Sequence, residues 1–523
     1  MNYEYGTARE MEDYKRRPTL PSLGNGWTTQ STPVEDCRDA HQPGGPRTLR
    51  ALCKVKVFSC LFGLATVFFV MASYILTREQ RGPILTASLH NLVSLARPAN
   101  LSSGADYAEL QEVVRTIVAK VAFEQREVPD LPELKEREPH IFSVIPRQFL
   151  PYLKNPCWYE DYTGNTTADP YERNLYLLYS KRFQAMYKHL HAAFLEHLHR
   201  RGNAPQRLRC LPYFYIIGQP KCGTTDLYDR LRLHPQVQFT TMKEPHWWTR
   251  KRFGIIRLNE GLRNPYPLED YLDLFDQAAY QIQDQFLDNS SRRKTRVDII
   301  AGEASASTMW DNNAWIYFYD NGTGVEPPYL VQDFIHAVQP NAKFIVMLRD
   351  PVERLYSDYL YFGMANKTVQ DFHERVSESL QLFETCLAQR SMRSCVYNTT
   401  LNNVMPVSVL PVRLHVGLYV VYLLDWLSVF SREQILVLRL EDHAANRKHT
   451  MHRVFDFLHL GPLTQQKEAD ITKSPASNAR RPANRSLGPM LPITKEILQS
   501  FYEPFNQKLA AVLSEPAFLW TQL

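Results

Sequence analysis

A short segment at residues 218–225 combines the residue types that hold phosphate groups. Gly218, Lys221, Cys222, Gly223, Thr224 and Thr225 follow the apolar run 213–217, and a helix-like stretch continues to Leu233. This order predicts a strand, a loop and a helix whose unpaired N–H groups and positive dipole end face the loop. The lysine and the two hydroxyls supply further donors. We interpret the segment as an anion cradle, with an ordinary strand and turn carrying a surface lysine as the alternative.

The position of the lysine separates this loop from that of nucleoside triphosphatases. Those loops read G-x-x-x-x-G-K-[ST], with the lysine after the second glycine and a hydroxyl for magnesium. Here Lys221 precedes Gly223, and we identify no convincing acidic metal partner in the sequence. A P-loop kinase or nucleotide hydrolase is therefore a less favoured alternative.

A second anion-binding motif follows later in the chain. Residues 343–348 form a continuous apolar run, which is typical of a buried strand in a parallel sheet. Arg349 and Asp350 come next, and Pro351 is suited to begin a helix that carries Ser357. Because open α/β sheets bind ligands at the carboxyl ends of their strands, both motifs are expected at one edge. A strand-end ion pair of Arg349 and Asp350 is the alternative.

Between these motifs lies the candidate chemistry, at Lys243-Glu244-Pro245-His246. A hydroxyl group is a poor nucleophile, and a positioned carboxylate that accepts its proton gives about 10²- to 10⁴-fold acceleration. Glu244 is a candidate base, and His246 is its rival because imidazole titrates near neutral pH. The following Trp247 and Trp248 are either core side chains or, if exposed, platforms for sugar rings.

Together these motifs resemble those of the carbohydrate sulfotransferases that use 3'-phosphoadenylyl sulfate (PAPS). The first loop is similar to their 5'-phosphosulfate loop, and the second motif to their 3'-phosphate site, which implies that Arg349 and Ser357 bind the 3'-phosphate. The Lys-Glu-Pro-His segment resembles that of the glycosaminoglycan sulfotransferases. The resemblance implies Glu244 as general base, and Lys221 would stabilise charge on the oxygen that leaves sulfur.

Further stretches carry the same resemblance over residues 141–523: 142–146, 156–160, 302–313 and 473–482. It implies transfer to the 6-hydroxyl of 4-sulfated N-acetylgalactosamine in chondroitin or dermatan sulfate, without a metal ion. The late basic loop with Lys473, Arg480 and Arg481 is similar to a family loop that contacts PAPS, although a solvated turn is the alternative. Glu303 is left open between a ligand contact and a structural carboxylate.

Basic residues directly after the candidate base suggest how a sulfated chain is held. Arg250, Lys251 and Arg252, with Lys243, Trp247 and Trp248, are the candidate acceptor-binding residues; Arg257 and Arg263 extend the basic run. Charge-assisted hydrogen bonds to sulfate groups are one interpretation, and a solvated loop is the other. The net charge of +5 is too small to identify a partner. We expect no nucleic-acid partner, and self-association is left open.

A membrane span and its flanking charges predict the topology. Val57–Thr77 is an uncharged run of 21 residues, enough to cross about 30 Å of hydrocarbon as a helix. It starts too late for a cleaved signal peptide. Five Lys or Arg residues precede it within twenty positions and three follow: Arg38, Arg47, Arg50, Lys54 and Lys56, then Arg78, Arg81 and Arg97. This bias favours a cytoplasmic amino terminus and a luminal carboxyl-terminal domain, as in a type II Golgi protein.

Acceptor triplets and cysteines agree with a luminal domain. All N-x-[ST] triplets follow the span, at Asn100, Asn165, Asn289, Asn321, Asn366, Asn398 and Asn484. An oxidising lumen favours a bridge between Cys386 and Cys395, worth about 2.5 to 3 kcal/mol on the loop-entropy model. A bridge between Cys157 and Cys210 is a weaker expectation, and Cys222 is expected to stay free.

The predicted organisation is a tail at 1–56, the span at 57–77, a stem at 78–140 and a catalytic domain at 141–523. Strand-like runs alternate with helix-like segments after residue 213, which predicts an α/β fold with a parallel sheet between helices. The resemblance implies the sulfotransferase version of this P-loop-type sheet. A non-catalytic carbohydrate-binding membrane glycoprotein would explain the tryptophans and the basic run, but not both anion motifs.

Overall fold

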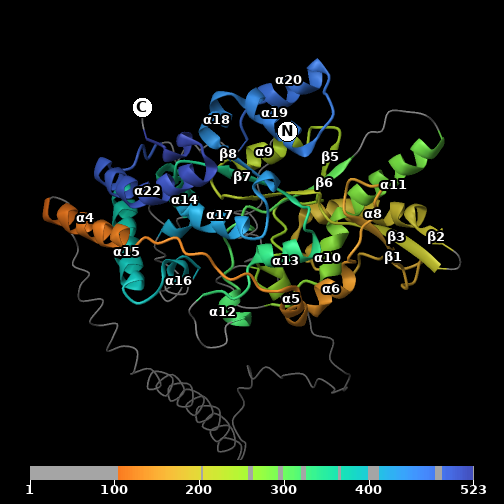
Figure 1. The fold of residues 1–523 in the computed structure, drawn as a ribbon. Helices are drawn as coiled ribbons and strands as arrows, with labels where there is room; N and C mark the ends of the chain where they lie inside the picture. Colours follow the sequence, from red (N-terminus) through yellow and green to blue (C-terminus); the bar gives the residue numbers. More distant parts are fainter. Residues whose placement is uncertain are drawn as a thin grey trace, which may run out of the picture. The chain divides into compact units, whose positions relative to one another are not determined.

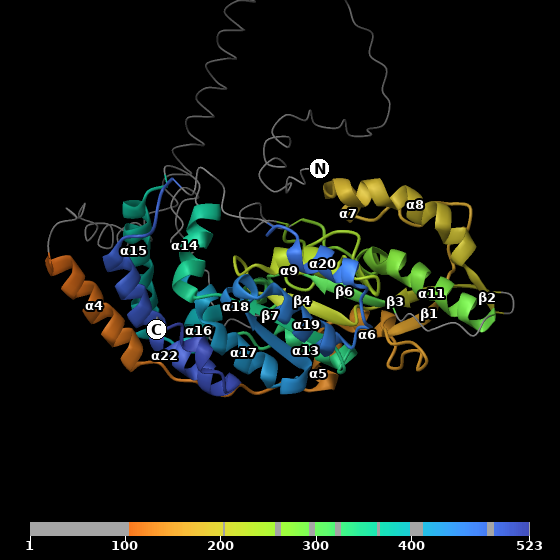
Figure 2. The ribbon, with the colours of Figure 1, turned by 90° about the horizontal axis from the view of Figure 1, so that it is seen from above.

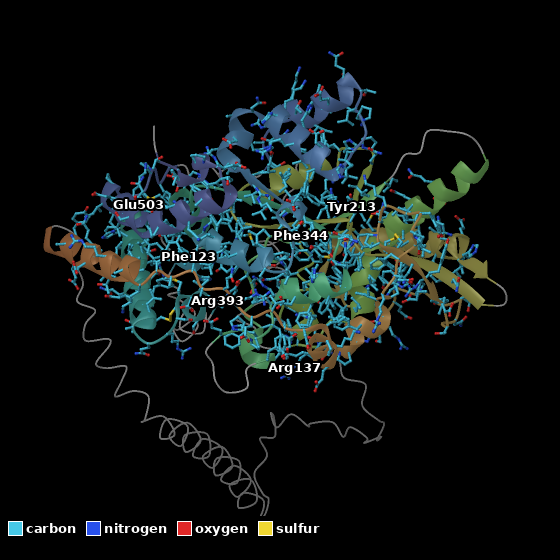
Figure 3. All side chains as sticks on the ribbon, viewed as in Figure 1. Phe123, Arg137, Tyr213, Phe344, Arg393 and Glu503 are labelled. Carbon is cyan, nitrogen blue, oxygen red and sulfur yellow. A yellow bond between two sulfur atoms is a disulfide. The ribbon has the colours of Figure 1, made fainter. Side chains whose placement is uncertain are left out.

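The structure, a computed structural model, describes residues 104–201, 204–256, 263–291, 299–319, 326–362, 367–397, 412–477 and 486–521. Within these ranges, a parallel sheet with helices on both faces forms the centre (Figure 1). Figure 3 shows Phe344, which lies on a central strand, among densely packed side chains in the middle of this unit. The α/β prediction is confirmed.

The central sheet has the strand order β5-β6-β4-β7-β8. The strands are β4 (Phe214–Gly218), β5 (Val237–Phe239), β6 (Ile300–Ala304), β7 (Lys343–Leu348) and β8 (Ile435–Arg439). All neighbouring pairs are parallel. Every residue of β4 and β6 is buried, which explains why these strands are apolar runs without alternation. Because β4 pairs with both β6 and β7, the loops that follow these three strands meet at one sheet edge.

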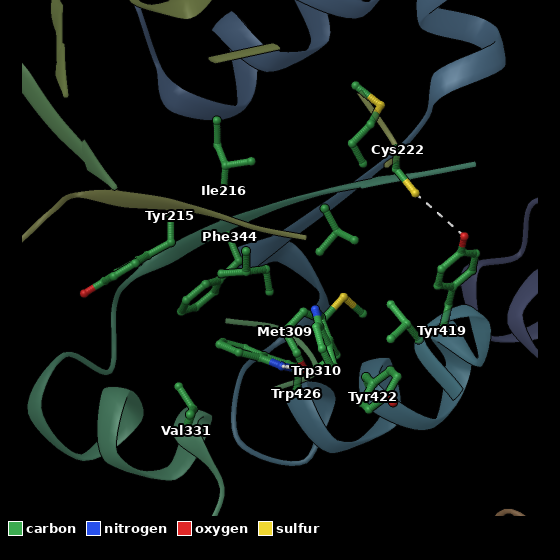
Figure 4. Packing of buried hydrophobic residues seen from close by; sticks show 14 of the residues in the cluster. Tyr215, Ile216, Cys222, Met309, Trp310, Val331, Phe344, Tyr419, Tyr422 and Trp426 are labelled. Carbon is green, nitrogen blue, oxygen red and sulfur yellow. Dashed lines mark hydrogen bonds between the residues drawn. The ribbon is translucent and has the colours of Figure 1, made fainter. Parts of the chain in front are cut away.

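Helices cover the two faces of this sheet. The helix α9 (Thr224–Leu231) lies on one face with α18 (Leu440–Ala445) and α19 (Arg447–Leu458), and α13 (Val331–Val338) and α17 (Tyr419–Leu427) lie on the other (Figure 1). Figure 4 shows Tyr215 and Phe344 directed toward the second layer, where Trp426 packs edge-to-face against Phe344 at 4.8 Å between ring centroids. This packing makes the central strands a rigid platform for the loops at their ends.

In the described part of the chain, ten further helices surround this core, in addition to three whose residue ranges are given below. They are α5 (Leu131–Arg137), α6 (Pro139–Val144), α7 (Tyr176–Tyr179), α8 (Lys181–His197), α10 (Leu268–Leu272), α11 (Asp276–Ser291), α12 (Trp315–Phe318), α14 (Pro351–Phe362), α16 (Met392–Tyr397) and α20 (Gln465–Lys473). Short 3₁₀ turns occupy Lys251–Phe253, Asp273–Phe275, Leu414–Gly417, Arg432–Gln434 and Pro516–Leu519.

A small antiparallel sheet precedes the central one and was not predicted. Its order is β1 (Cys157–Asp161), β3 (Ala204–Cys210) and β2 (His199–Arg201). The strand β3 alternates polar and apolar residues only weakly, because Arg209 is buried there between Asp273 and Asp276 at 2.8 and 2.9 Å. The sequence signal for a strand is therefore hidden by a buried ion network.

Two disulfides are present among the described cysteines. One joins Cys386 and Cys395, as predicted, and links α15 (Val369–Leu387) to α16. The weaker expectation is also confirmed, because Cys157 bonds to Cys210 across the pair β1 and β3. Cys222 is free and buried, as expected.

The unit begins before the predicted boundary at residue 141. The helix α4 (Gly104–Ala119) buries Leu110, Val114 and Ile117 and packs against α15 and α22 (Pro492–Leu513). Figure 2 shows these three helices side by side at one end. The carboxyl-terminal part of the expected stem is therefore folded into this unit, because its apolar face has partners that are distant in the sequence.

Several predictions fall outside the described residues. These include the run 57–77 and the triplets at Asn100, Asn321, Asn366, Asn398 and Asn484. Among the described helices, none combines the length and apolar character needed to cross a bilayer. Asn165 is exposed in the loop after β1, and Asn289 lies near the end of α11.

Candidate active site

The anion cradle lies between β4 and α9, as predicted. Gly223 is the residue before the helix and has a φ of 88°, and a Cβ there would lie 2.6 Å from Leu440 Cδ1. Only glycine meets both conditions without strain. The first N–H groups of α9, from Thr224 and Thr225, have no intrahelical acceptors and face the loop. The sequence thus places a short helix end and two hydroxyls around one anion position.

Lys221 projects from this loop over an aromatic ring. Its φ is 68°, which is unusual for a residue other than glycine, and its Nζ lies 3.6 Å from the ring centroid of Tyr361 on α14. Burial, with the neighbouring charges of Arg349 and Arg413 and against the opposing charge of Asp358, lowers the pKa of Lys221 to about 8. The lysine is thus held as a partly desolvated cation, a suitable partner for a second anion.

The second anion motif occupies the neighbouring strand end. Arg349 follows β7, and its Nη2 lies 3.4 Å from Glu353 Oε2. Asp350 precedes α14 and caps its start, because the Asp350 carboxylate accepts from the Val352 N–H at 2.9 Å. Ser357 is half-buried on the same helix. The structure thus brings Arg349 to the edge that holds Lys221, and the weak contact with Glu353 leaves the guanidinium able to bind a further anion.

Glu244 follows β5 and is fixed by an adjacent strand. Its N–H donates to the Ala304 carbonyl at the end of β6 at 2.9 Å, and its φ is 59°. Lys243 Nζ donates to Oε1, and 37% of the Glu244 side chain remains exposed. Burial raises the pKa of Glu244, but the Lys243 and His246 contacts outweigh it and leave the pKa well below its usual value. Glu244 is therefore ionised and accessible.

His246 belongs to a chain of hydrogen bonds that ends at Glu244. Its Nε2 lies 3.3 Å from Glu244 Oε2, and its Nδ1 lies 2.7 Å from Ser307 Oγ, which in turn lies 3.0 Å from Thr249 Oγ1. Burial lowers the pKa of His246, so the ring is neutral near pH 7. Because an ionised carboxylate only accepts, Nε2–H must donate to Glu244 and Nδ1 must accept from Ser307. Both ring nitrogens of His246 are therefore engaged in hydrogen bonds. This favours a role in positioning Glu244 over one in which His246 accepts the proton.

Hydrogen bonds to residues of β6 and the loop after it support the backbone at His246. The His246 N–H donates to Ser305 Oγ at 3.1 Å, and the Ser305 hydroxyl donates to Glu303 Oε1 at 2.6 Å. Glu303 is buried on β6, and burial raises its pKa to about 8. The sequence left the role of Glu303 open. In the structure, its carboxylate accepts from Ser305 and so supports the loop that carries His246. The positive φ of His246, 52°, shows why such support is required.

The two tryptophans are core residues. Trp247 and Trp248 are 3% and 2% exposed, and Trp247 stacks on Tyr271 at 5.1 Å between centroids. Their indole N–H groups donate to the Tyr266 carbonyl and the Tyr271 hydroxyl, at 3.0 and 3.3 Å. Their assignment to sugar stacking is therefore wrong, because neither ring presents a face to solvent.

The adjacent cations are engaged by other residues of the chain. Arg250 lies 2.5 Å from the buried carboxylate of Asp311. Lys251 is buried over the rings of Tyr176 and Tyr266, at 4.6 and 4.9 Å. Arg252 is 5% exposed and pairs with Glu138 at 3.3 Å. Tertiary partners bury Lys251 and the Arg252 side chain and leave Arg250 20% exposed, so these residues are not a solvated loop, and their role in acceptor binding stays a prediction.

The late basic loop is anchored to the helix of the cradle. Arg230 on α9 donates to the Ser474 and Pro475 carbonyls, at 2.9 and 3.3 Å, and pairs with Asp226 at 2.6 Å. Asp226 also accepts from the Ser477 N–H at 2.7 Å. Lys473 is exposed at the end of α20, whereas Arg480 and Arg481 lie outside the described residues.

Sequence reasoning missed several residues of this site. Tyr361, near the end of α14, contacts Lys221, and Arg413, which precedes the 3₁₀ turn Leu414–Gly417, pairs with Asp358. Ser307 lies within the distinctive stretch 302–313, but only its pairing with His246 shows its use. Within the described ranges, no group of three or more His, Cys, Asp or Glu side chains could hold a metal ion.

The geometry brings a cation and a carboxylate to the same sheet edge from separate loops. The Glu244 N–H donates to the end of β6, and β6 pairs with β4, whose carboxyl end carries the Lys221 loop, so the two loops follow neighbouring strands. A donor anion in the cradle and a hydroxyl at Glu244 would meet there. Such an arrangement can transfer a charged group to a hydroxyl.

Comparison with known proteins agrees with this chemistry. Residues 211–479 match the sulfotransferase domain family. The chain is 57% identical to carbohydrate sulfotransferase 15 of Homo sapiens, and also of Mus musculus, over 89% of this chain and 86% of each relative. A solved sulfotransferase from Alicyclobacillus acidocaldarius is 22% identical over 59% of this chain and 98% of its own, with a TM-score of 0.34. The chain therefore belongs to the carbohydrate sulfotransferase family and is a sulfotransferase enzyme.

Proposed function

We propose that this enzyme is an N-acetylgalactosamine 4-sulfate 6-O-sulfotransferase. It transfers a sulfuryl group from PAPS to the 6-hydroxyl of 4-sulfated N-acetylgalactosamine in chondroitin or dermatan sulfate. The observation that carries the reaction class is that the anion cradle with Lys221 follows β4, while the loop with Glu244 is hydrogen-bonded to the end of the neighbouring strand β6. The choice of acceptor rests on the resemblance of the motifs and on the relatives named carbohydrate sulfotransferase 15.

The donor fits the polar groups of the strand ends. The Thr224 and Thr225 N–H and hydroxyl groups, with Lys221, would hold the 5'-phosphosulfate. Arg349 and Ser357 would hold the 3'-phosphate, and Lys473, Arg480 and Arg481 would close over the nucleotide. No step of this reaction needs a metal ion, because cations of the chain face the developing charge.

The transfer itself is a single displacement at sulfur. The acceptor oxygen forms the new O–S bond and gives its proton to Glu244. The bond from sulfur to the bridging phosphate oxygen breaks, and Lys221 stabilises the charge on that oxygen. His246 holds Glu244 through the Nε2 contact of 3.3 Å. Lys243, which donates to the other carboxylate oxygen, lowers the basicity of Glu244, so we expect that contact to loosen when the acceptor hydroxyl binds.

We propose that the catalytic unit faces the Golgi lumen. The run 57–77 would anchor it as a single-pass type II membrane protein, and the disulfides Cys157–Cys210 and Cys386–Cys395 suit an oxidising compartment. Protease added to intact Golgi vesicles should remove only about the first 50 residues and leave a glycosylated, membrane-held fragment. Loss of the carboxyl-terminal domain would reverse this orientation.

An acceptor panel tests the activity directly. The purified luminal fragment should transfer labelled sulfate from PAPS to chondroitin 4-sulfate and dermatan sulfate, and disaccharide analysis should find units with both the 4- and 6-sulfates. Heparan sulfate serves as the control acceptor, since a mouse heparan sulfate glucosamine 3-O-sulfotransferase is 24% identical over 59% of this chain. Preferential labelling of heparan sulfate would transfer the proposal to that acceptor. Hydrolysis of ATP with magnesium would instead favour a nucleotide hydrolase.

A further inference from the structure

The helix α8 carries a basic face that the proposed mechanism does not use. Arg182, Lys188 and His189 are exposed on its first half, whereas Phe183, Leu190 and Phe194 are buried on the other side. The helix thus packs by an apolar stripe and presents the charged side chains of Arg182 and Lys188 to solvent. Two acidic residues lie beside the helix: Asp169 lies 3.8 Å from His191, and Asp284 lies 3.0 Å from His197. The only exposed acidic residue on the helix, Glu196, is near its carboxyl end.

Arg182 does not stabilise the start of the helix. The helix begins at Lys181, with Arg182 next, and its first turn has no acidic residue. A cation at a helix amino terminus interacts unfavourably with the macrodipole. The Ser180 side chain caps the helix by accepting from the Phe183 N–H at 3.1 Å. A role in helix formation therefore does not explain Arg182.

The basic face starts beside the catalytic segment. Tyr176, on α7, donates from its hydroxyl to the Pro245 carbonyl at 3.1 Å, and Pro245 lies between Glu244 and His246. The helix α8 begins directly after α7, and Figure 2 shows the two in succession along one edge of this unit. With a rise of about 1.5 Å per residue, Lys188 lies roughly 10 Å further along α8 than its first residue. Arg182 and Lys188 are thus arranged along α8 in the direction away from the catalytic segment.

We propose that α8 binds the acceptor chain beyond the sugar that reacts. An acidic polysaccharide would lie along Arg182 and Lys188, which provide charge-assisted contacts to its sulfate and carboxylate groups, with His189 as a further polar contact. This inference rests on the proposed function and adds a preference for long, sulfated chains. The helix precedes residues 211–479, the part that matches the sulfotransferase domain, so it is an addition to that domain.

The test removes charge from α8 without altering the reaction centre. The Arg182→Gln/Lys188→Gln variant should raise the KM for long chondroitin 4-sulfate roughly threefold to tenfold at low salt. Its kcat, and its KM for a tetrasaccharide too short to reach α8, should stay unchanged. The matched control is Lys120→Gln/Arg147→Gln, which neutralises two exposed cations on other elements. An unchanged KM for the long chain, or an equal rise with the tetrasaccharide, would overturn the proposal.

A binding measurement separates this inference from the proposed reaction. Wild-type protein should bind immobilised long chondroitin 4-sulfate without PAPS, and the α8 variant should bind several-fold more weakly at equal thermal stability. Chemically desulfated chains should show a smaller difference between the two proteins. Equal binding of variant and wild type would refute the α8 surface, even if sulfate transfer occurs. Absence of transfer by the wild type, with the binding difference intact, would refute only the proposed reaction.

Discussion

The cradle at 218–225 and the segment at 243–252 both follow strands of one sheet, yet they were predictable to different degrees. The cradle consists of backbone N–H groups at a helix start and a glycine with positive φ, features that a short sequence specifies by itself. In the second segment, charged side chains differ in how much of their surface is exposed to solvent. Glu244 is 37% exposed, whereas Arg252, eight positions later, is 5% exposed. A local motif therefore identifies a backbone site well, but it does not show which neighbouring side chains face the substrate.

The largest expected effect is at Glu244. The Glu244→Gln variant keeps the shape of the side chain but removes the base, so kcat should fall by about 10²- to 10⁴-fold while PAPS affinity persists. His246→Asn should cost less, because both ring nitrogens are already engaged. Turnover of both purified variants at saturating substrates is the measurement. A nearly normal Glu244→Gln beside an inactive His246→Asn would transfer the role to the histidine.

Loss of the cradle cation should be nearly as severe. Lys221→Ala removes the group that faces the breaking bond, and the rate should fall on the order of 10²- to 10³-fold or below detection. The matched control is Lys473→Ala, an exposed lysine at the border of the nucleotide site, which should raise the KM for PAPS with little change in kcat. Wild-type turnover of a folded Lys221→Ala variant would exclude the loop from the mechanism.

The second strand-end motif should act on binding alone. Arg349→Ala removes a charge-assisted contact to the 3'-phosphate, which should weaken PAPS binding by roughly ten- to a hundredfold. Calorimetric titration with the product nucleotide measures this loss without catalysis. If nucleotide affinity were unchanged and acceptor binding collapsed, the assignment of Arg349 to the 3'-phosphate would be wrong.

The hydrogen-bond chain behind His246 predicts a smaller effect. Ser307→Ala removes the donor to Nδ1 and frees the ring to rotate or change tautomer, so kcat should fall about tenfold with unchanged PAPS affinity. Ser305→Ala acts on the backbone instead and should lower thermal stability as well. A Ser307→Ala variant with normal kcat would show that the ring orientation does not depend on this contact.

The pH dependence of nucleotide binding should show the smallest effect. Burial lowers the pKa of Lys221 to about 8, so the free enzyme loses this charge as the pH rises through that value. The affinity for PAPS should therefore fall above about pH 8. In the Lys221→Arg variant, this loss should be absent, because a guanidinium keeps its charge. An identical decline in both proteins would assign the titration to another group.

The sequence alone determined the strands of the central sheet and the two anion motifs, whereas the preference for Glu244 came from the resemblance to a known family. These features depend on short-range rules: apolar runs form buried strands, and a loop before a helix exposes N–H groups. The resemblance to carbohydrate sulfotransferases rested on the same motifs.

Only the tertiary structure decided which side chains are accessible. Trp247, Trp248 and Lys251 are buried by residues from distant segments, such as Tyr176 and Tyr271, and no local pattern reveals those partners. The Ser307 contact with His246 likewise joins loops after two different strands. Burial and ion pairing depend on contacts between distant parts of the chain, whereas backbone motifs depend on neighbours in sequence. For this reason the backbone motifs were predictable, and the burial and pairing of side chains were not.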